Sequence, residues 1–312
     1  MYFPVLRGRQ FELIALRELI ENKLIGKHVL PIVEPVKLTA TLNTTLSAFR
    51  EANSEIAVIR NPRVGEFVSK LRNPDNEKVT EKFYAEIEKG SFISTYYIDN
   101  KDRLDASHIT QKGLSLDQCI AICLNKDSLS KYKNIFGTTF PKYTLIPDER
   151  SMRRSISTHK VLLDDKFDKK ARNTDYAIEE DTPFSEDHLF YDDEGYVGFA
   201  DYSIVGAEYN ESGFAPYAVV IHIVYPDEDG ALRIHHFVSD SNDDISDPAG
   251  KFEEALQKFH HWNQMHKLDT FGANEFEKLY NNQYYPGLGT VKKLSIMHHI
   301  ELVSRYLDGV KQ

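Results

Sequence analysis

The sequence has only two cysteines among its 312 residues, Cys119 and Cys123, and both lie in one short apolar run. Two cysteines are too few for a disulfide framework, and no second pair is present to complete a zinc site. We therefore expect two buried free thiols, which are usual in a reducing compartment.

Long apolar runs are also missing from the sequence. None approaches the roughly 18 residues that a membrane-spanning helix needs. The first ten residues include Pro4, Arg7 and Arg9 and lack the apolar region of a signal peptide. The sequence therefore predicts a cytoplasmic protein that has no membrane partner.

Basic residues are in the minority, with 38 lysines and arginines against 48 aspartates and glutamates and a formal charge of −10. A surface of this sign repels the phosphate backbone of nucleic acids. A nucleotide or nucleic acid is therefore expected to bind only through a local basic patch. The segment 148–172 is the candidate, with Arg153 and Arg154 among its basic residues. Such a run is also typical of a solvated helix face.

Short apolar runs that end in polar residues recur along the first 200 residues, and stretches with helical spacing of apolar residues separate them. Strands of this kind are typical of a parallel sheet covered by helices. Eight runs are present, at 2–6, 28–33, 56–59, 92–98, 119–124, 143–146, 160–163 and 196–200. Eight repeats favour a (β/α)8 barrel of the TIM type. A doubly wound open sheet is the alternative, although no glycine-rich dinucleotide motif follows any strand.

The pattern changes in the last third of the chain. We predict a barrel region over 1–206, and a hairpin and C-terminal helices over 207–312 that pack on the same domain. The hairpin pairs 218–225 with 232–238 across a turn rich in Pro, Asp and Gly. Asp247 and Pro248 then open an amphipathic helix to about residue 266, expected to be the eighth helix of the barrel. A loop over 280–289 precedes a last helix.

The carboxyl ends of barrel strands meet at one mouth, where active sites of this fold lie. The residues that follow the predicted strands therefore form one candidate site. Carboxylates there can hold a divalent cation such as Mg²⁺ or act as acid and base, and arginines can clamp an anion. The candidate catalytic residues are Glu34, Asp99 and Asp201, and the candidate substrate-binding residues are Arg7, Arg60, Asp148 and Asp164. Polar residues at strand ends also commonly cap the next helix.

Two other features are candidates for function. The stretch 172–188 is long for a barrel loop, and long loops at a barrel mouth carry lids and specificity elements. His222 and His236 are expected to face each other across the hairpin, where a nearby acid such as Asp201 would complete an acid–base or metal site. Half-buried imidazoles with satisfied hydrogen bonds are the alternative.

Two stretches near the N-terminus, 2–12 with 15–16 and 31–35, resemble the Beta family of phage-satellite and bacterial genomic-island proteins. The stretches 172–176, 198–202 and 248–252 continue the resemblance over most of the chain. The resemblance implies a gene beside toxin-like or anti-phage genes and a protein that acts with a companion protein. It supplies no catalytic residues.

Two functions follow from these observations. The first is a Beta-like component of a genetic-conflict system that uses its barrel as a scaffold for a companion protein. The second is a metal-dependent barrel enzyme that acts on a phosphate-bearing substrate, such as a nucleotide or a nucleic-acid end, through the strand-end carboxylates. No serine-hydrolase elbow, Walker loop, kinase motif set or Cys–His nucleophile signature is present. Surface candidates for the partner are Arg153 with Arg154, and the loop at Tyr284 and Tyr285.

Overall fold

The predicted (β/α)8 barrel is confirmed. A computed structural model describes residues 1–111, 114–210 and 216–309. Eight parallel strands close into a barrel, and the last of them pairs with the first. The barrel strands are β1 (Tyr2–Leu6), β2 (Ile32–Val33), β3 (Ala57–Ile59), β4 (Ile93–Tyr97), β5 (Ile120–Ile122), β6 (Tyr143–Ile146), β7 (Lys160–Leu163) and β9 (Gly198–Asp201).

Alternate residues of these strands point into and out of the barrel, because successive side chains of a strand lie on opposite faces. The inward side chains form one apolar cluster, which includes Phe3, Val5, Ile32, Ile59, Tyr97, Ile122, Leu145, Leu163 and Tyr202. The outward side chains join a second, larger cluster beneath the helices. Both faces are therefore apolar, which explains why the strands read as continuous apolar runs.

Short helices follow the strands on the outside of the barrel. The α-helices of this region are α1 (Gln10–Glu21), α2 (Ala40–Glu51), α3 (Phe67–Arg72), α4 (Glu77–Glu88), α5 (Ala106–Ile109), α6 (Ser128–Phe136), α7 (Arg150–Ser155) and α8 (Asp187–Phe190), with 3-10 turns at η1 (Pro74–Asn76), η3 (Leu116–Gln118) and η4 (Asn173–Ala177). Thr39 caps α2 and Asp105 caps α5 through their side chains, so some strand-to-helix polar residues do serve as caps.

A separate antiparallel sheet contains β10 (Val220–Pro226), β11 (Leu232–Val238) and β8 (Asp181–Ser185), with β11 in the middle. The hairpin of β10 and β11 is as predicted. The prediction of a loop over 172–188 is wrong for the residues of β8, which form a strand. Its sequence includes Asp181 and Pro183, which are unusual in strands but acceptable at a sheet edge. Asp181 is held there by Arg233 and His235 of β11.

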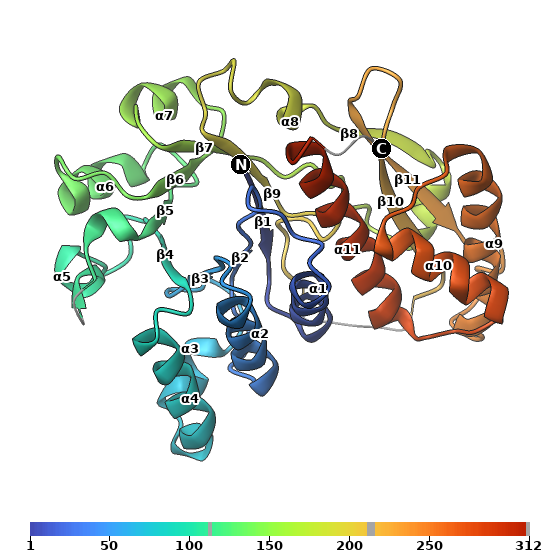
Figure 1. Ribbon diagram of the computed structural model, residues 1–312, viewed down its shortest axis with the longest axis horizontal. Coiled ribbons are helices and arrows are strands. Elements are labelled where there is room, and N and C mark those ends of the chain that lie inside the picture. The colour runs from blue at the N-terminus through green and yellow to red at the C-terminus, as the bar shows by residue number, and fades with distance from the viewer. Residues whose placement is uncertain (112–113, 211–215, 310–312) are drawn as a thin grey trace.

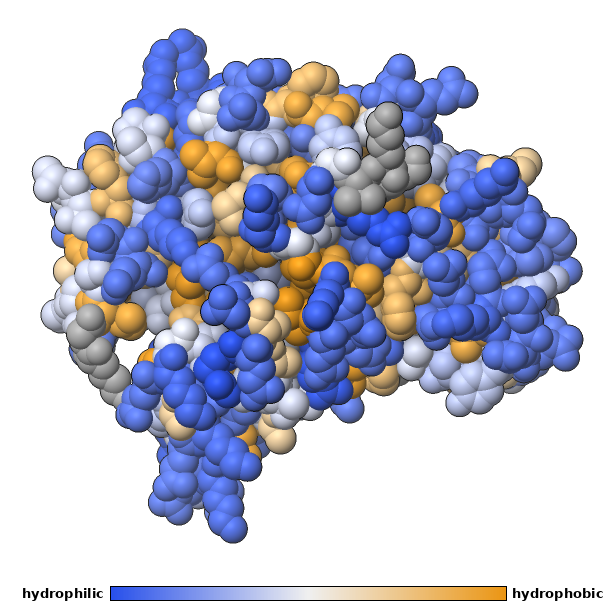
Figure 2. Space-filling view, in the orientation of Figure 1, coloured by the Kyte–Doolittle hydropathy of each residue, from blue (hydrophilic) through white to orange (hydrophobic). Residues whose placement is uncertain are grey.

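The C-terminal helices are α9 (Pro248–His266), α10 (Phe271–Asn282) and α11 (Leu288–Leu307). Helix α9 packs on β10, β11 and α10, so the prediction that it would be the eighth barrel helix is wrong. Helix α11 takes that place and packs on α1 and β1. Figure 1 shows α11 between the barrel and the part that contains α9 and α10. In Figure 2 the surface over α9 and α10 is mainly hydrophilic.

Each helix in the described part of the chain is either too short or too polar to cross a membrane.

Closure of the barrel requires a residue without a side chain at position 198. A Cβ on Gly198 would lie 2.4 Å from the backbone oxygen of Met1 and 2.8 Å from the Phe3 ring. We expect Gly198→Ala to force β9 away from β1 and to lower the free energy of unfolding by roughly 1–3 kcal/mol. Urea denaturation measures this loss. The neighbouring Val197→Ala, at an exposed position, is the control and should change stability by about 0.5 kcal/mol or less. Equal effects of the two substitutions would contradict the proposed crowding.

Candidate functional site at the barrel mouth

An ion pair between Arg7 and Glu34 lies at the mouth of the barrel, and both side chains are buried. Arg7 follows β1 and Glu34 follows β2, so the ion pair joins the ends of two adjacent strands. The Glu34 carboxylate also accepts hydrogen bonds from the Tyr97 hydroxyl at 2.9 Å and from the backbone N–H of Arg63 at 2.7 Å. Three groups of the chain therefore satisfy this buried carboxylate.

The second acid of the mouth, Asp99, is closer to solvent. Its carboxylate pairs with the Arg63 guanidinium at 3.0 Å, and both side chains are about one-third exposed. Arg63 also lies over the Tyr97 ring, 4.5 Å from its centroid. Asn61 extends the pairing of β3 and β4, because its side-chain amide exchanges two hydrogen bonds of 2.9 Å with the backbone of Tyr97.

The backbone that follows β9 returns across the mouth. Arg7 donates to the carbonyl of Ala207, and Asp165 accepts a hydrogen bond of 2.8 Å from the N–H of the same residue. The Tyr202 ring lies beneath the Arg7 guanidinium, with its centroid at 5.3 Å. The segment 202–207 therefore covers part of the mouth and is held there by charged side chains from β1 and β7.

Burial and the ion pair shift the titration of these groups. Burial raises the pKa of Tyr97 well above its usual value, and the adjacent Glu34 carboxylate raises it further. Burial likewise raises the pKa of Tyr202 to about 12. Burial alone would lower the pKa of Arg7, but Glu34, Tyr97 and Tyr202 together outweigh that effect, so the net shift is upward. Glu34 therefore lies beside the Arg7 cation and close to two neutral phenols.

Strand alternation decides which of the predicted residues meet here. Arg7, Glu34 and Asp99 are in phase with the inward side chains of β1, β2 and β4, and they lie at the mouth. The other four predicted residues are out of phase, and each contacts groups outside the barrel: Arg60, Asp148, Asp164 and Asp201. The prediction that all strand-end residues converge therefore holds for only three of the seven.

Three of the outward residues have local partners. Asp148 accepts from the Tyr196 hydroxyl and pairs with Arg153, both at 2.8 Å. Asp164 pairs with Lys166 at 2.8 Å. The buried Asp201 accepts hydrogen bonds from the Tyr2 hydroxyl at 2.8 Å and from the backbone N–H of Ser203 at 2.7 Å. These contacts hold the three acids to neighbouring groups on the outer side of the barrel.

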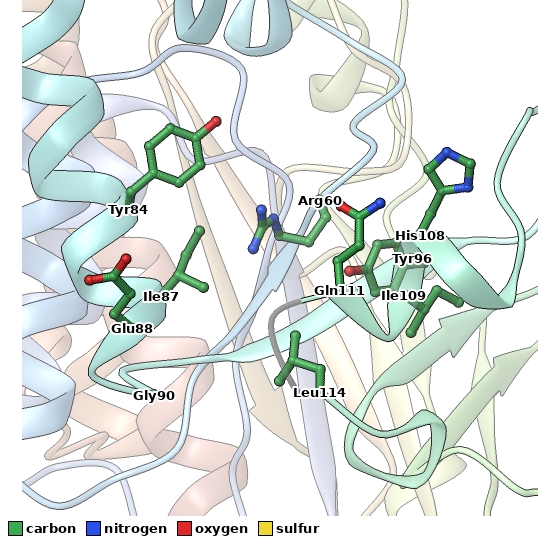
Figure 3. Close-up of a pocket in the computed structure, with 10 residues that line it drawn as sticks. All are labelled: Arg60, Tyr84, Ile87, Glu88, Gly90, Tyr96, His108, Ile109, Gln111 and Leu114. Atoms are coloured by element: carbon green, nitrogen blue, oxygen red, sulfur yellow. The ribbon is translucent and has the colours of Figure 1, made fainter.

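Arg60 lies in a pocket of about 630 Å³ outside the barrel, beside α4 and the region of α5 (Figure 3). Its guanidinium is 5.8 Å from the centroid of the Phe83 ring and 5.9 Å from that of Phe92. Burial lowers its pKa, and Tyr96 and Tyr84 partly oppose that shift. Arg60 is therefore separated from Arg7 by the wall of the barrel.

The sequence missed Arg63, Tyr97 and Tyr202. Tyr97 had a usable signal, because it lies two residues before Asp99 and so on the same face of β4. Arg63 lies in an irregular segment after β3, and only the three-dimensional structure places its backbone beside Glu34.

The histidine pair is formed as predicted. His222 and His236 are directly opposite in the hairpin register, and their Nδ1 atoms are 2.7 Å apart. Burial lowers the pKa of His222 well below its usual value and that of His236 to about 4. Asp201, the acid suggested for this pair, is instead bonded to Tyr2 and Ser203. Across residues 1–111, 114–210 and 216–309, no three His, Cys, Asp or Glu side chains group in a way suited to a metal ion.

The two predicted partner surfaces differ in shape. Arg153 of α7 pairs with Asp148, both side chains are partly exposed, and the neighbouring Arg154 is exposed. By contrast, a pocket of about 680 Å³ opens between α9 and α10 beside Tyr284, whose side chain is 62% exposed. Phe252 and Tyr285 form part of its apolar wall, with ring centroids 5.4 Å apart. The charged residues that line it are both acidic, Asp247 and Glu253. This pocket is called the α9–α10 groove below.

Comparisons with known proteins place the chain in no family. No protein-family model matches it, and no curated protein matches it. Among solved structures, the C-terminal domain of a "putative chitinase" from Desulfitobacterium hafniense DCB-2 aligns with 98% of this chain and 99% of that domain. The sequence identity is 11% and the TM-score is 0.33, a similarity that supports no conclusion about function.

The pH dependence of stability tests the position of Asp201. Burial raises the pKa of this carboxyl from 3.8 to about 6, although hydrogen bonds from Ser203 and Tyr2 oppose the shift. Between these values the folded state binds more protons than the unfolded state, so this carboxyl destabilises the fold increasingly as the pH rises. Asp201→Asn keeps an acceptor oxygen but cannot ionise. We expect it to gain stability relative to the wild type from pH 4 to pH 6, by up to about 3 kcal/mol. Urea unfolding at four pH values measures the difference, and parallel pH profiles would contradict the expectation.

Proposed function

We propose that this chain is a Beta-like component of a bacterial or phage genetic-conflict system, of the anti-phage defence or toxin–immunity type. In this proposal the barrel is a scaffold that binds a companion protein from the same locus. The resemblance to the Beta family supplies the biological context, and the contacts at the barrel mouth supply the physical argument.

The observation that carries the proposal is the engagement of Glu34 by three donors. Its carboxylate is buried and bonded to Arg7, Tyr97 and the backbone of Arg63. A general base must have a lone pair within reach of a substrate proton, and these contacts occupy three of the roughly four acceptor sites of the carboxylate. Glu34 therefore acts here as a support for the strand ends.

Three of the five stretches that carry the resemblance meet at the barrel mouth. Arg7 belongs to the first stretch, Glu34 to the second, and Tyr202 to the stretch 198–202. Their contacts link β1, β2 and β9. If the chain shares these residues with the Beta family because of these contacts, the residues maintain the scaffold. The companion protein then binds elsewhere.

The α9–α10 groove is the surface that we assign to the companion protein. It combines aromatic side chains with two acids, Asp247 and Glu253, and Tyr284 stands exposed at its edge. Exposed aromatic residues are enriched where proteins bind one another. The groove therefore fits a partner segment that presents an apolar or aromatic side chain flanked by lysine or arginine.

Co-expression with the products of adjacent genes tests this proposal. We expect one of them to co-purify with the chain, and Tyr284→Ala combined with Glu253→Lys to weaken the complex at least tenfold, measured by calorimetric titration. Phe140→Ala is the matched control, because Phe140 is also an exposed aromatic residue but lies before β6. This control should leave the affinity unchanged.

Two results would count against the proposal. If no product of an adjacent gene binds, the scaffold function is wrong. If a product binds equally well to the double variant and to the control, the scaffold function holds and the groove is the wrong surface.

Asp99 favours the second candidate, a metal-dependent enzyme that acts on a phosphate-bearing substrate. Its carboxylate is partly exposed at the mouth and lies beside the partly exposed Arg63. Mg²⁺ is often held by one or two carboxylates together with substrate phosphates. A rise in melting temperature with Mg²⁺ and a nucleotide that disappears in Asp99→Ala would favour this candidate over the scaffold.

A further inference from the structure

A second cavity, of about 270 Å³, lies between the barrel and the antiparallel sheet. It is bounded by the segments after β7 and β9, by β10, and by the first two turns of α11. Because β7 and β9 are the seventh and eighth strands of the barrel, the cavity is on the mouth side. It is called the lysine pocket below.

Three lysines line the pocket, Lys169, Lys170 and Lys292, and no acid lines it among the residues that the structure describes. Two of these lysines have acidic partners at the rim. Lys169 pairs with Glu208 at 3.3 Å and Lys170 pairs with Asp168, and both acids are about three-quarters exposed. Ion pairs with such exposed acids contribute little, so an anion inside the pocket can replace them at small cost.

The side chain of Lys292 is about one-third exposed, like those of the other two lysines. Burial lowers its pKa, and the nearby cations Arg9 and Lys169 lower it further. Its acidic partner, Glu12, lies 3.4 Å away and is also near the backbone N–H of Arg9. Four cations thus lie in one region, together with Glu12, Asp168 and Glu208, the acids that pair with the three lysines. A bound anion would relieve the mutual repulsion of the cations.

Helix α11 borders the pocket with the face that carries Leu288, Val291, Lys292 and Ser295. It has 20 residues, and its first residue, Leu288, lines the pocket together with Val291 and Lys292. The N-terminus of a helix of this length carries a partial positive charge. In (β/α)8 barrels, loops after the seventh and eighth strands and a helix N-terminus commonly form a phosphate site. The lysine pocket shares the two loops, and the first two turns of α11 lie beside them.

We propose that the lysine pocket binds the phosphate group of a small phosphorylated metabolite. Its volume is just below the range of about 300–1,000 Å³ for ligand pockets, so it has room for a phosphate and a short organic group. The apolar side chains of Ile204 and Val291 lie beside the organic group, and the lysines contact the phosphate oxygens.

The pocket is next to the mouth but distinct from it. Ile204 and Val205 line the pocket, and Ala207 of the same segment is bound by Arg7 and Asp165 at the mouth. A ligand in the pocket therefore contacts the segment that covers the mouth. This inference does not depend on the companion protein, and its failure would leave the α9–α10 groove untouched.

Calorimetric titration of the whole protein tests the inference. The probes are inorganic phosphate and glycerol phosphate, each compared with chloride at equal ionic strength. We expect saturable binding of both phosphate probes and none of chloride. Lys169→Gln combined with Lys170→Gln should weaken binding at least tenfold. Lys78→Gln combined with Lys82→Gln on α4 removes the same charge from exposed positions and should change the affinity less than twofold.

Melting curves without phosphate show whether each variant is folded. We expect both double variants to fold, because all four lysines lie at exposed or partly exposed positions. Failure of both phosphate probes to bind would overturn the inference. So would equal affinities of the two double variants, because the phosphate would then bind elsewhere. Binding of a 5′-phosphorylated oligonucleotide without binding of the small probes would overturn the assignment to a metabolite.

Discussion

The buried ion pair between Arg7 and Glu34 is the interaction on which the architecture of the barrel mouth depends. Removing two charges from water costs several kcal/mol per ion, and the attraction between them offsets that cost only when the remaining polar groups are also satisfied. The chain meets most of this requirement with the Tyr97 hydroxyl, the backbone N–H of Arg63 and the carbonyl of Ala207, whereas the buried Nε of Arg7 has no partner among the described residues. Each of these groups comes from a different segment. The ion pair therefore fixes the ends of β1 and β2 and also the two irregular segments beside them.

The fold was easier to predict from the sequence than the site. Eight apolar runs with helices between them are a signal spread over 200 residues, and the structure confirms the barrel. The site depends instead on the phase of each strand end. Glu34 and Asp99 continue the inward face, whereas Asp201 and Arg60 continue the outward face, and a run of apolar residues on both faces does not reveal which is which.

Long-range contacts account for the other differences. Strand β8 has the composition of a loop and is a strand because Asp181 meets Arg233 and His235 of the neighbouring strand. Helix α11 covers β1 although 86 residues separate it from the last barrel strand. Neither feature has a local signal. Together they create the boundary between barrel and sheet at which the lysine pocket lies. The positions of this pocket and of the segment 202–207 therefore depend on the complete fold.

A double-mutant cycle on Arg7 and Glu34 tests most directly whether their ion pair supports the barrel mouth. The free energies of unfolding would be compared for the wild type, Arg7→Met, Glu34→Gln and the double variant. If the ion pair supports the mouth, each single variant should lose about 3–5 kcal/mol, since the remaining charge stays buried without its partner. The double variant should lose less than the sum of the two, by about 1–3 kcal/mol. Small and additive losses would contradict the account and would return Glu34 to the list of catalytic candidates.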